Sequence, residues 1–271
     1  MEFKDRVAMI TGAGGRLGRP CALAFAREGA RVLMTDLHDA NLERAALDVR
    51  ATGATVAAVA GDISRQDHVE RIVGEGSRAI GPVDVLVNFA AYAPTNTVAE
   101  VTVEEWDKTF AVNVRGTMLC CKTVSAQMIQ RGSGGVIINI SSGASTSARI
   151  GGAHYCGSKA AVNMMTEVLA IELGPHGIRV NAIAPGLFMD TVLHTTDEAP
   201  HPYVRDMLKA IPLGRTGELD EIANAALFLA SPRASYVHGE IFYVTGGTHC
   251  GRTHMAAARG VGAQQAIDQK R

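Results

Sequence analysis

One stretch near the N-terminus decides the fold, Thr11-Gly12-Ala13-Gly14-Gly15-Arg16-Leu17-Gly18, because it joins a short apolar run at residues 7–10 to a segment of helical character at 17–28. Glycines at a strand-to-helix turn let the backbone approach a pyrophosphate closely, and the helix N-terminus stabilises its negative charge. The stretch predicts the opening βαβ unit of a dinucleotide-binding sheet, although such a loop taken alone could be only a tight turn.

Strand-like and helix-like segments alternate from this stretch to residue 245. The strand-like runs are almost continuously apolar, which is typical of parallel strands covered on both faces. The alternation predicts a single-domain α/β fold, a Rossmann-type doubly wound parallel sheet of about seven strands with helices on both faces. The expected strands are residues 7–10, 31–36, 55–62, 83–90, 135–142, 179–185 and 241–245, and the expected helices are 17–28, 41–51, 69–79, 103–131, 154–173 and 219–230.

Two segments depart from the alternation. Residues 187–216 contain three prolines and no clean period, so we expect a long functional loop with one short helix. We assign residues 1–247 to one NAD-binding domain that includes this loop. Residues 248–271 form a C-terminal extension, which is either a mobile tail or a cover over an active site.

Composition excludes several classes of protein. The 271 residues carry 26 Lys and Arg against 27 Asp and Glu, a formal net charge of −1, so no basic field exists for a nucleic acid. No apolar run approaches the ~18 residues of a membrane span, and we expect no signal peptide. Five cysteines without paired spacing predict neither a disulfide framework nor a zinc site, which fits a reducing cytoplasm.

Asp36 ends the second expected strand, 24 residues after Gly12. A carboxylate at this place can accept hydrogen bonds from the hydroxyls of the adenosine ribose, and it repels a 2′-phosphate. Asp36 and the adjacent Leu37 therefore favour NAD over NADP. The alternative is that Asp36 serves only as a turn or helix-cap residue.

Tyr155 and Lys159 lie near the start of an expected helix. The i,i+4 spacing places both side chains on one face, where the ammonium can lower the pKa of the phenol by favouring phenolate. A phenol with a free pKa near ~10 needs such help to act as an acid or base. Ser142 precedes Tyr155 by 13 residues and ends an expected strand, where sites of parallel sheets lie.

This pattern resembles the short-chain dehydrogenase/reductase family, in its compact form, over residues 3–247. The order and spacing of the motifs make chance similarity improbable. The matching motifs are the glycine-rich loop from Thr11, Asp62-Ile63, Asn88, Asn113 within Phe110-Ala111-Val112-Asn113-Val114, Ser142, Tyr155, Lys159, Pro185-Gly186 and Thr245-Gly246-Gly247.

The resemblance implies an NAD-dependent oxidoreductase that interconverts a secondary alcohol and a ketone. Tyr155 would move a proton to or from the substrate oxygen while a hydride passes between the substrate carbon and nicotinamide. Ser142 would hydrogen-bond the carbonyl or alkoxide. Lys159 would bind the nicotinamide ribose and lower the pKa of Tyr155, and Asn113 would hold a water that links Lys159 to solvent. A homotetramer, or less often a homodimer, is also implied.

The resemblance further implies a set of cofactor contacts. Asp62 and Ile63 would flank adenine, Asn88 and Ala90 would line the cofactor, and Gly186 and Phe188 would lie near the nicotinamide. With the residues already named, the expected NAD-binding set is Gly12, Gly14, Arg16, Leu17, Gly18, Asp36, Leu37, Asp62, Ile63, Asn88, Ala90, Tyr155, Lys159, Pro185, Gly186, Phe188 and Thr191.

Three positions depart from the family pattern. Arg16 stands where glycine is usual and could lie along the pyrophosphate or point to solvent. Phe89 stands where a second asparagine is usual, and we expect it to alter packing beside the cofactor. The threonine expected after Pro185-Gly186 is displaced by one residue, which makes Thr191 the candidate carboxamide contact and Asp190 its rival.

The sequence does not identify the substrate. Residues 143–154 and 187–212 would form its walls, where Arg149 could recognise a substrate carboxylate or face solvent. We expect no metal, since His194, His201 and His249 are scattered.

Three rival functions remain open. An NADPH-dependent 3-ketoacyl or carbonyl reductase is disfavoured by Asp36. A non-catalytic dinucleotide-binding regulator is disfavoured by the intact Ser142, Tyr155 and Lys159. An epimerase or dehydratase with the same Tyr-Lys pair would ordinarily have a larger C-terminal region.

Overall fold

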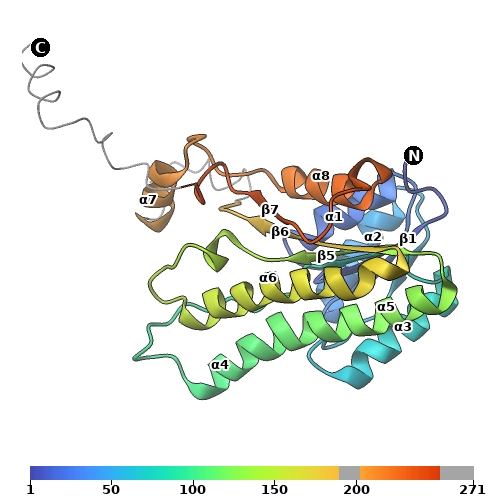
Figure 1. Ribbon diagram of the computed structural model, residues 1–271, viewed down its shortest axis with the longest axis horizontal. Coiled ribbons are helices and arrows are strands. Elements are labelled where there is room, and N and C mark those ends of the chain that lie inside the picture. The colour runs from blue at the N-terminus through green and yellow to red at the C-terminus, as the bar shows by residue number, and fades with distance from the viewer. Residues whose placement is uncertain (189–201, 251–271) are drawn as a thin grey trace, which may run out of the picture.

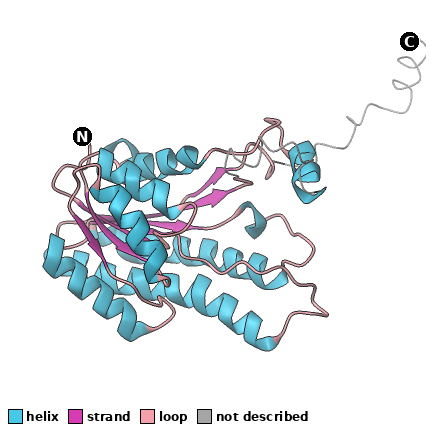
Figure 2. Cartoon of the chain, turned by 180° about the vertical axis from the view of Figure 1, so that it is seen from behind, coloured by secondary structure: helices cyan, strands magenta, loops and turns pink. Residues whose placement is uncertain are grey.

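A seven-stranded parallel sheet with helices on both faces forms the body of the molecule (Figures 1 and 2). The computed structural model describes residues 1–188 and 202–250. The strand order, β3-β2-β1-β4-β5-β6-β7, reverses between β1 and β4, which confirms the predicted doubly wound Rossmann-type fold. The strands are β1 (Val7–Thr11), β2 (Arg31–Thr35), β3 (Val56–Ala58), β4 (Val85–Asn88), β5 (Gly135–Ile140), β6 (Ile178–Pro185) and β7 (Ile241–Val244).

The helices form two layers around the sheet (Figure 1). One layer holds α1 (Gly18–Arg27), α2 (Asp39–Arg50) and α8 (Leu219–Ala230), and the other holds α3 (Gln66–Ile80), α5 (Thr117–Arg131) and α6 (Ala153–Leu173). The two remaining helices, α4 (Val103–Phe110) and α7 (Pro202–Ala210), lie toward the left end of Figure 1. Every residue of β1 and β4 is buried, as their continuous apolar runs predict.

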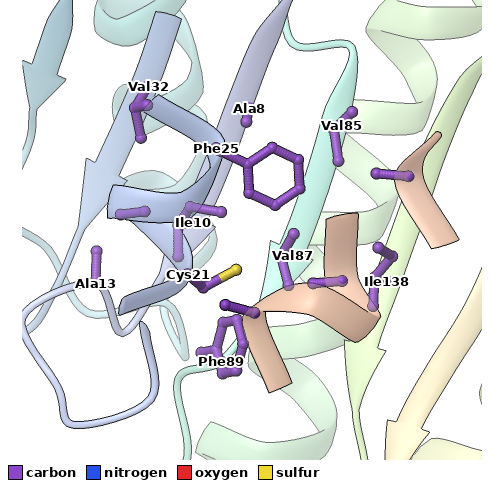
Figure 3. Close-up of a cluster of buried hydrophobic side chains, with 14 of the residues drawn as sticks. Ala8, Ile10, Ala13, Cys21, Phe25, Val32, Val85, Val87, Phe89 and Ile138 are labelled. Atoms are coloured by element: carbon purple, nitrogen blue, oxygen red, sulfur yellow. The ribbon is translucent and has the colours of Figure 1, made fainter. Parts of the chain in front are cut away.

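The core beneath α1 explains one of the unusual residues. Figure 3 shows Phe25 of α1 over the sheet, among side chains of β1 and β4. Phe89 follows β4, lies near Cys21 in the same view, and is 8% exposed. The Phe89 ring therefore completes the core at the carboxyl end of β4, next to the expected cofactor position.

The ends of most expected elements shift by one to three residues, and two elements differ more. The strand expected over 55–62 pairs with β2 only at Val56–Ala58, because β3 is an edge strand with one neighbour. The helix expected over 103–131 is divided by a π-helical turn, Ala111–Gly116. The Thr117 hydroxyl donates a hydrogen bond to the Asn113 carbonyl across this turn (2.8 Å). Such turns inside α-helices often occur at functional sites.

None of the helices in the described ranges combines the length and the apolar composition that crossing a bilayer requires. All five cysteines lie in those ranges, and all are free. Cys21, Cys120 and Cys121 are buried, and burial raises the pKa of each thiol, which keeps them uncharged packing residues.

Candidate active site

The candidate site lies at the carboxyl edge of the sheet, where the strand order reverses. Ligands of open parallel sheets bind at this edge because connections to opposite faces leave a crevice. The glycine-rich stretch follows β1, Asp36 follows β2, and Ser142 follows β5, so all three reach the same edge. Hollows open at this edge, and two of them matter for the expected site: a cleft of about 530 Å³ along the glycine-rich stretch, and a pocket of about 390 Å³ beside Ser142.

The glycine-rich stretch runs so close to other backbone that side chains would not fit. Gly12 has φ +64°, and a Cβ on it would lie 2.8 Å from the Cα of Ala90. A Cβ on Gly18 would overlap the carbonyl oxygen of Gly12. Gly18 begins α1, whose cap residue Leu17 supplies no side-chain hydrogen bond, and both residues line the cleft. This uncapped helix N-terminus fits the pyrophosphate of a dinucleotide.

The carboxylate of Asp36 lines the cleft and also holds the local backbone. Its Oδ2 accepts a hydrogen bond from the Gly14 amide (3.0 Å), and its Oδ1 accepts one from the His38 amide (3.1 Å). Asp36 therefore does act as a turn residue, which was the alternative to cofactor binding. The turn role does not exclude a cofactor role, because a carboxylate has about four acceptor sites.

Arg16 was expected to lie along the pyrophosphate or to point to solvent, and it instead contacts the backbone after β6. It is exposed and lines the cleft, and its Nη1 donates a hydrogen bond to the carbonyl oxygen of Phe188 (2.5 Å). Phe188 follows β6 and is 172 positions away along the chain. The arginine therefore joins the glycine-rich stretch to the start of the expected substrate loop.

Ser142 and Tyr155 line the pocket together. Ser142 caps a 3-10 turn, Gly143–Ser145, and its Oγ accepts a hydrogen bond from the Ala144 amide (3.1 Å). Tyr155 lies in the first turn of α6. The neighbouring Ser145 donates its hydroxyl to the Ser142 carbonyl (2.7 Å), which places it in the turn.

Lys159 lies one helical turn after Tyr155 and is only 2% exposed. Its Nζ is 5.8 Å from the centroid of the Tyr155 ring and donates a hydrogen bond to the Ile140 carbonyl (2.7 Å). Burial lowers the pKa of Lys159 to about 8, since water no longer solvates the ammonium. When protonated, this ammonium favours the phenolate form of the nearby phenol.

Asn113 is fully buried in the π-helical turn and ties three elements together. Its side chain makes two hydrogen bonds to the backbone of Tyr92, accepting from the amide (2.8 Å) and donating to the carbonyl (2.9 Å). It also donates to the Ser158 hydroxyl (2.9 Å) on α6. The Asn113 amide therefore fixes the loop after β4 against the helix that carries Tyr155 and Lys159.

The structure places most of the other expected cofactor residues around the cleft and the pocket, although Gly14 and Phe188 line neither. Asn88 differs: its side chain lies behind the cleft, where it donates a hydrogen bond to the Asn139 side chain (2.9 Å), so Phe89 and Ala90 line the cleft in its place. Thr191 lies outside the described residues. The cleft is lined by Gly12, Arg16, Leu17, Gly18, Asp36, Leu37, Asp62, Ile63 and Ala90, and the pocket by Pro185 and Gly186.

Two residues of the pocket, Arg149 and His249, have no substrate or cofactor role that the sequence alone assigns. Arg149 lines the pocket with its guanidinium carbon 5.1 Å from the Tyr155 ring centroid. His249, considered earlier only as a metal ligand, also lines the pocket, with its ring stacked on Tyr243 (4.3 Å between centroids). The sequence does contain a signal for His249. It follows the last strand, β7, which ends at the carboxyl edge of the sheet where the pocket lies.

The described residues contain no group of three or more His, Cys, Asp and Glu side chains that could hold a metal ion. His154, next to Tyr155 on α6, is fully buried.

Comparisons with known proteins agree with this geometry. A family model described as enoyl-(acyl carrier protein) reductase matches residues 12–249. The chain is 39% identical over 253 residues to a (2S)-[(R)-hydroxy(phenyl)methyl]succinyl-CoA dehydrogenase subunit of Thauera aromatica, covering 91% of this chain and 98% of that one. It is 36% identical to a sorbitol dehydrogenase of Cereibacter sphaeroides, covering 91% and 98%. The crystal structure of an NAD+-bound xylitol dehydrogenase has a TM-score of 0.85 at 29% identity, covering 91% and 100%.

Proposed function

Because the chain belongs to the short-chain dehydrogenase/reductase family, we propose that it transfers a hydride between a secondary alcohol or ketone and NAD, with Tyr155 as general acid and base. The observation that carries the proposal is the meeting of Ser142 and Tyr155 in one pocket, with Lys159 buried beside the Tyr155 ring. The similar proteins named for sorbitol, xylitol and an acyl-CoA alcohol support the reaction class.

The proposed reaction divides the work between three side chains. NAD, when held in the cleft, would supply the acceptor for the hydride that leaves the substrate carbon. Tyr155 takes the substrate hydroxyl proton in oxidation and returns it in reduction. Ser142 hydrogen-bonds the substrate oxygen and so orients the reacting carbon. The Lys159 ammonium would favour the phenolate form of Tyr155, which would help a proton move in either direction.

Residues along the cleft would hold the cofactor. The N-terminus of α1, which begins at Gly18 and packs against Gly12, would bind the pyrophosphate. Asp36 would accept hydrogen bonds from the adenosine ribose and repel a 2′-phosphate, which favours NAD over NADP. Arg16 and Phe188 would close over the pyrophosphate through their shared hydrogen bond. The rest of the proposed set comprises Gly14, Leu37, Asp62, Ile63, Ala90, Tyr155, Lys159, Pro185, Gly186 and Thr191.

We also propose that the enzyme is a homotetramer or a homodimer. Large apolar side chains are exposed along α4 and α6, among them Trp106 (40%), Met164 (60%) and Ile171 (79%). Trp106 stacks on Phe110, one turn further along α4 (5.2 Å between centroids). A second copy of the chain covering these side chains would remove them from water. The free cysteines further favour a reducing compartment, the cytoplasm.

A screen of secondary alcohols, followed by NADH absorbance with NAD and NADP in parallel, tests the reaction and the cofactor. Turnover with NAD and a lower kcat/KM with NADP are expected. A clear preference for NADP would support the carbonyl reductase instead. Tyr155→Phe should abolish turnover while NADH still binds, and unchanged turnover would refute the assigned mechanism.

A further inference from the structure

We propose that Arg149 binds a carboxylate of the substrate, so that the enzyme acts on a hydroxy acid or keto acid rather than on a neutral polyol. This inference rests on the proposed function, because it names the substrate class of the same pocket. It starts from the position of one guanidinium group relative to Tyr155.

The Arg149 side chain lies over the face of the Tyr155 ring. Its guanidinium carbon is 5.1 Å from the ring centroid, and Arg149 is half-buried and not directed wholly to solvent. Gly152 makes room for this arrangement, since a Cβ there would lie 2.8 Å from the Cγ of Arg149. The Gly152 amide also donates a hydrogen bond to the Arg149 carbonyl (3.2 Å), which fixes the turn that aims the side chain.

The charge of Arg149 has no counter-ion in the described part of the chain. No ion pair between described residues includes it, and its Nε is buried without a hydrogen-bond partner. The Nε has no exposed surface, so a ligand in the pocket can reach the guanidinium only through its other two nitrogens. A carboxylate is the natural ligand, because the planar guanidinium matches its two oxygens.

Among the described lining residues of the pocket, Arg149 is the one Lys or Arg, and no acidic side chain accompanies it. No Asp or Glu of that lining would therefore repel a carboxylate. The remaining polar side chains are hydroxyls and one imidazole, from Thr95, Ser142, Ser147, Tyr155, Thr248 and His249. A neutral polyol would use the hydroxyl groups but would leave the Arg149 charge unpaired.

His249 gives the carboxylate a second neighbour in the pocket. Its ring is stacked on Tyr243, and its Nδ1 lies 2.7 Å from the Thr245 hydroxyl, so both contacts hold the ring in one orientation. Arg149 comes from the loop after β5 and His249 from the segment after β7. The two residues bring separate parts of the chain to one pocket, and Arg149 supplies the charge.

The test compares pairs of substrates that differ only in charge. Hydroxy acids with one to four carbons between carbinol and carboxylate, each with its methyl ester, are assayed for kcat/KM with NAD. The wild type should prefer the acid of the best pair. Arg149→Gln should lower the acid-to-ester ratio of kcat/KM by about 10- to 100-fold, the usual strength of a charge-assisted hydrogen bond. Arg149→Lys should recover part of that ratio.

Arg78→Gln provides the matched control, because it removes the same charge from an exposed position on α3. It should leave the acid-to-ester ratio within about twofold of the wild-type value. Equal losses on acid and ester in Arg149→Gln would overturn the proposal and assign Arg149 to positioning of Tyr155. A wild-type enzyme without preference for the acid would overturn it as well.

A binding measurement separates this proposal from the proposed function. Keto acids and their esters are titrated calorimetrically into Tyr155→Phe protein containing NADH, with and without Arg149→Gln. Acid binding that depends on Arg149, without turnover of any alcohol by the wild type, would refute the dehydrogenase function and uphold the carboxylate site. Turnover of neutral alcohols without acid-selective binding would refute the site and uphold the function. Absence of both would refute both.

Discussion

Lys159→Met should remove a rise with pH in the unfolding free energy of the cofactor-free protein. The wild-type ammonium is buried, and its pKa falls from the ordinary 10.5 to about 8 because water no longer solvates it. Between these two values the unfolded chain binds the proton and the folded protein does not. Wild-type stability therefore rises with pH across this window, and below pH 8 the full cost of the buried charge is present.

The magnitude follows from the two pKa values of Lys159. Each pKa unit corresponds to ~1.36 kcal/mol, so the gap between 10.5 and about 8 destabilises the folded protein by about 3 kcal/mol at neutral pH. Between pH 7 and pH 9.5, about 2 kcal/mol of this cost should disappear in the wild type. The methionine variant keeps the aliphatic bulk, has no proton to lose, and should not show this increment.

Urea unfolding at pH 7, 8, 9 and 9.5, at fixed protein concentration, measures the difference between the two proteins. Subtracting the variant from the wild type cancels the titrating groups outside the Tyr155–Lys159 pair. Lys122→Met, at an exposed position on α5, is the matched control and should give a flat difference. A flat difference for Lys159→Met as well would refute the desolvation of the ammonium, and with it the electrostatic basis assigned to the Tyr155–Lys159 pair.

Gly18→Ala should weaken NAD binding at least tenfold and lower the Tm, because its Cβ would overlap the Gly12 carbonyl and overpacking costs about 1–3 kcal/mol. Calorimetric titration and thermal denaturation measure both effects, with Gly74→Ala, whose Cβ meets nothing within 4 Å, as the control; wild-type values would contradict the contact. Arg16→Ala should raise the Kd for NAD about 3- to 30-fold through loss of the hydrogen bond to Phe188, and an unchanged Kd would remove Arg16 from cofactor binding.

The parts of the site that depend on local periodicity could be predicted from the sequence. Tyr155 and Lys159 share a face because a helix repeats every 3.6 residues, and the structure places them together. Gly12, Asp36 and Ser142 reach one edge because parallel strands all end there. Strand limits were less predictable: the segment at 55–62 forms only a three-residue strand, since an edge position pairs it on one side.

Contacts that depend on long-range packing were not predictable. The hydrogen bond from Arg16 to Phe188 joins residues 172 positions apart, and no periodicity connects them. The position of the Arg149 side chain depends on Gly152, a residue without a functional group. The side chain reaches the Tyr155 ring because Gly152 leaves space for it. The sequence shows Arg149 and Gly152, but it does not show that the Arg149 side chain packs where a Gly152 side chain would otherwise lie. The proposed substrate contact therefore depends on packing that the sequence does not show, whereas the proposed proton-transfer residues share a face that their spacing already predicts.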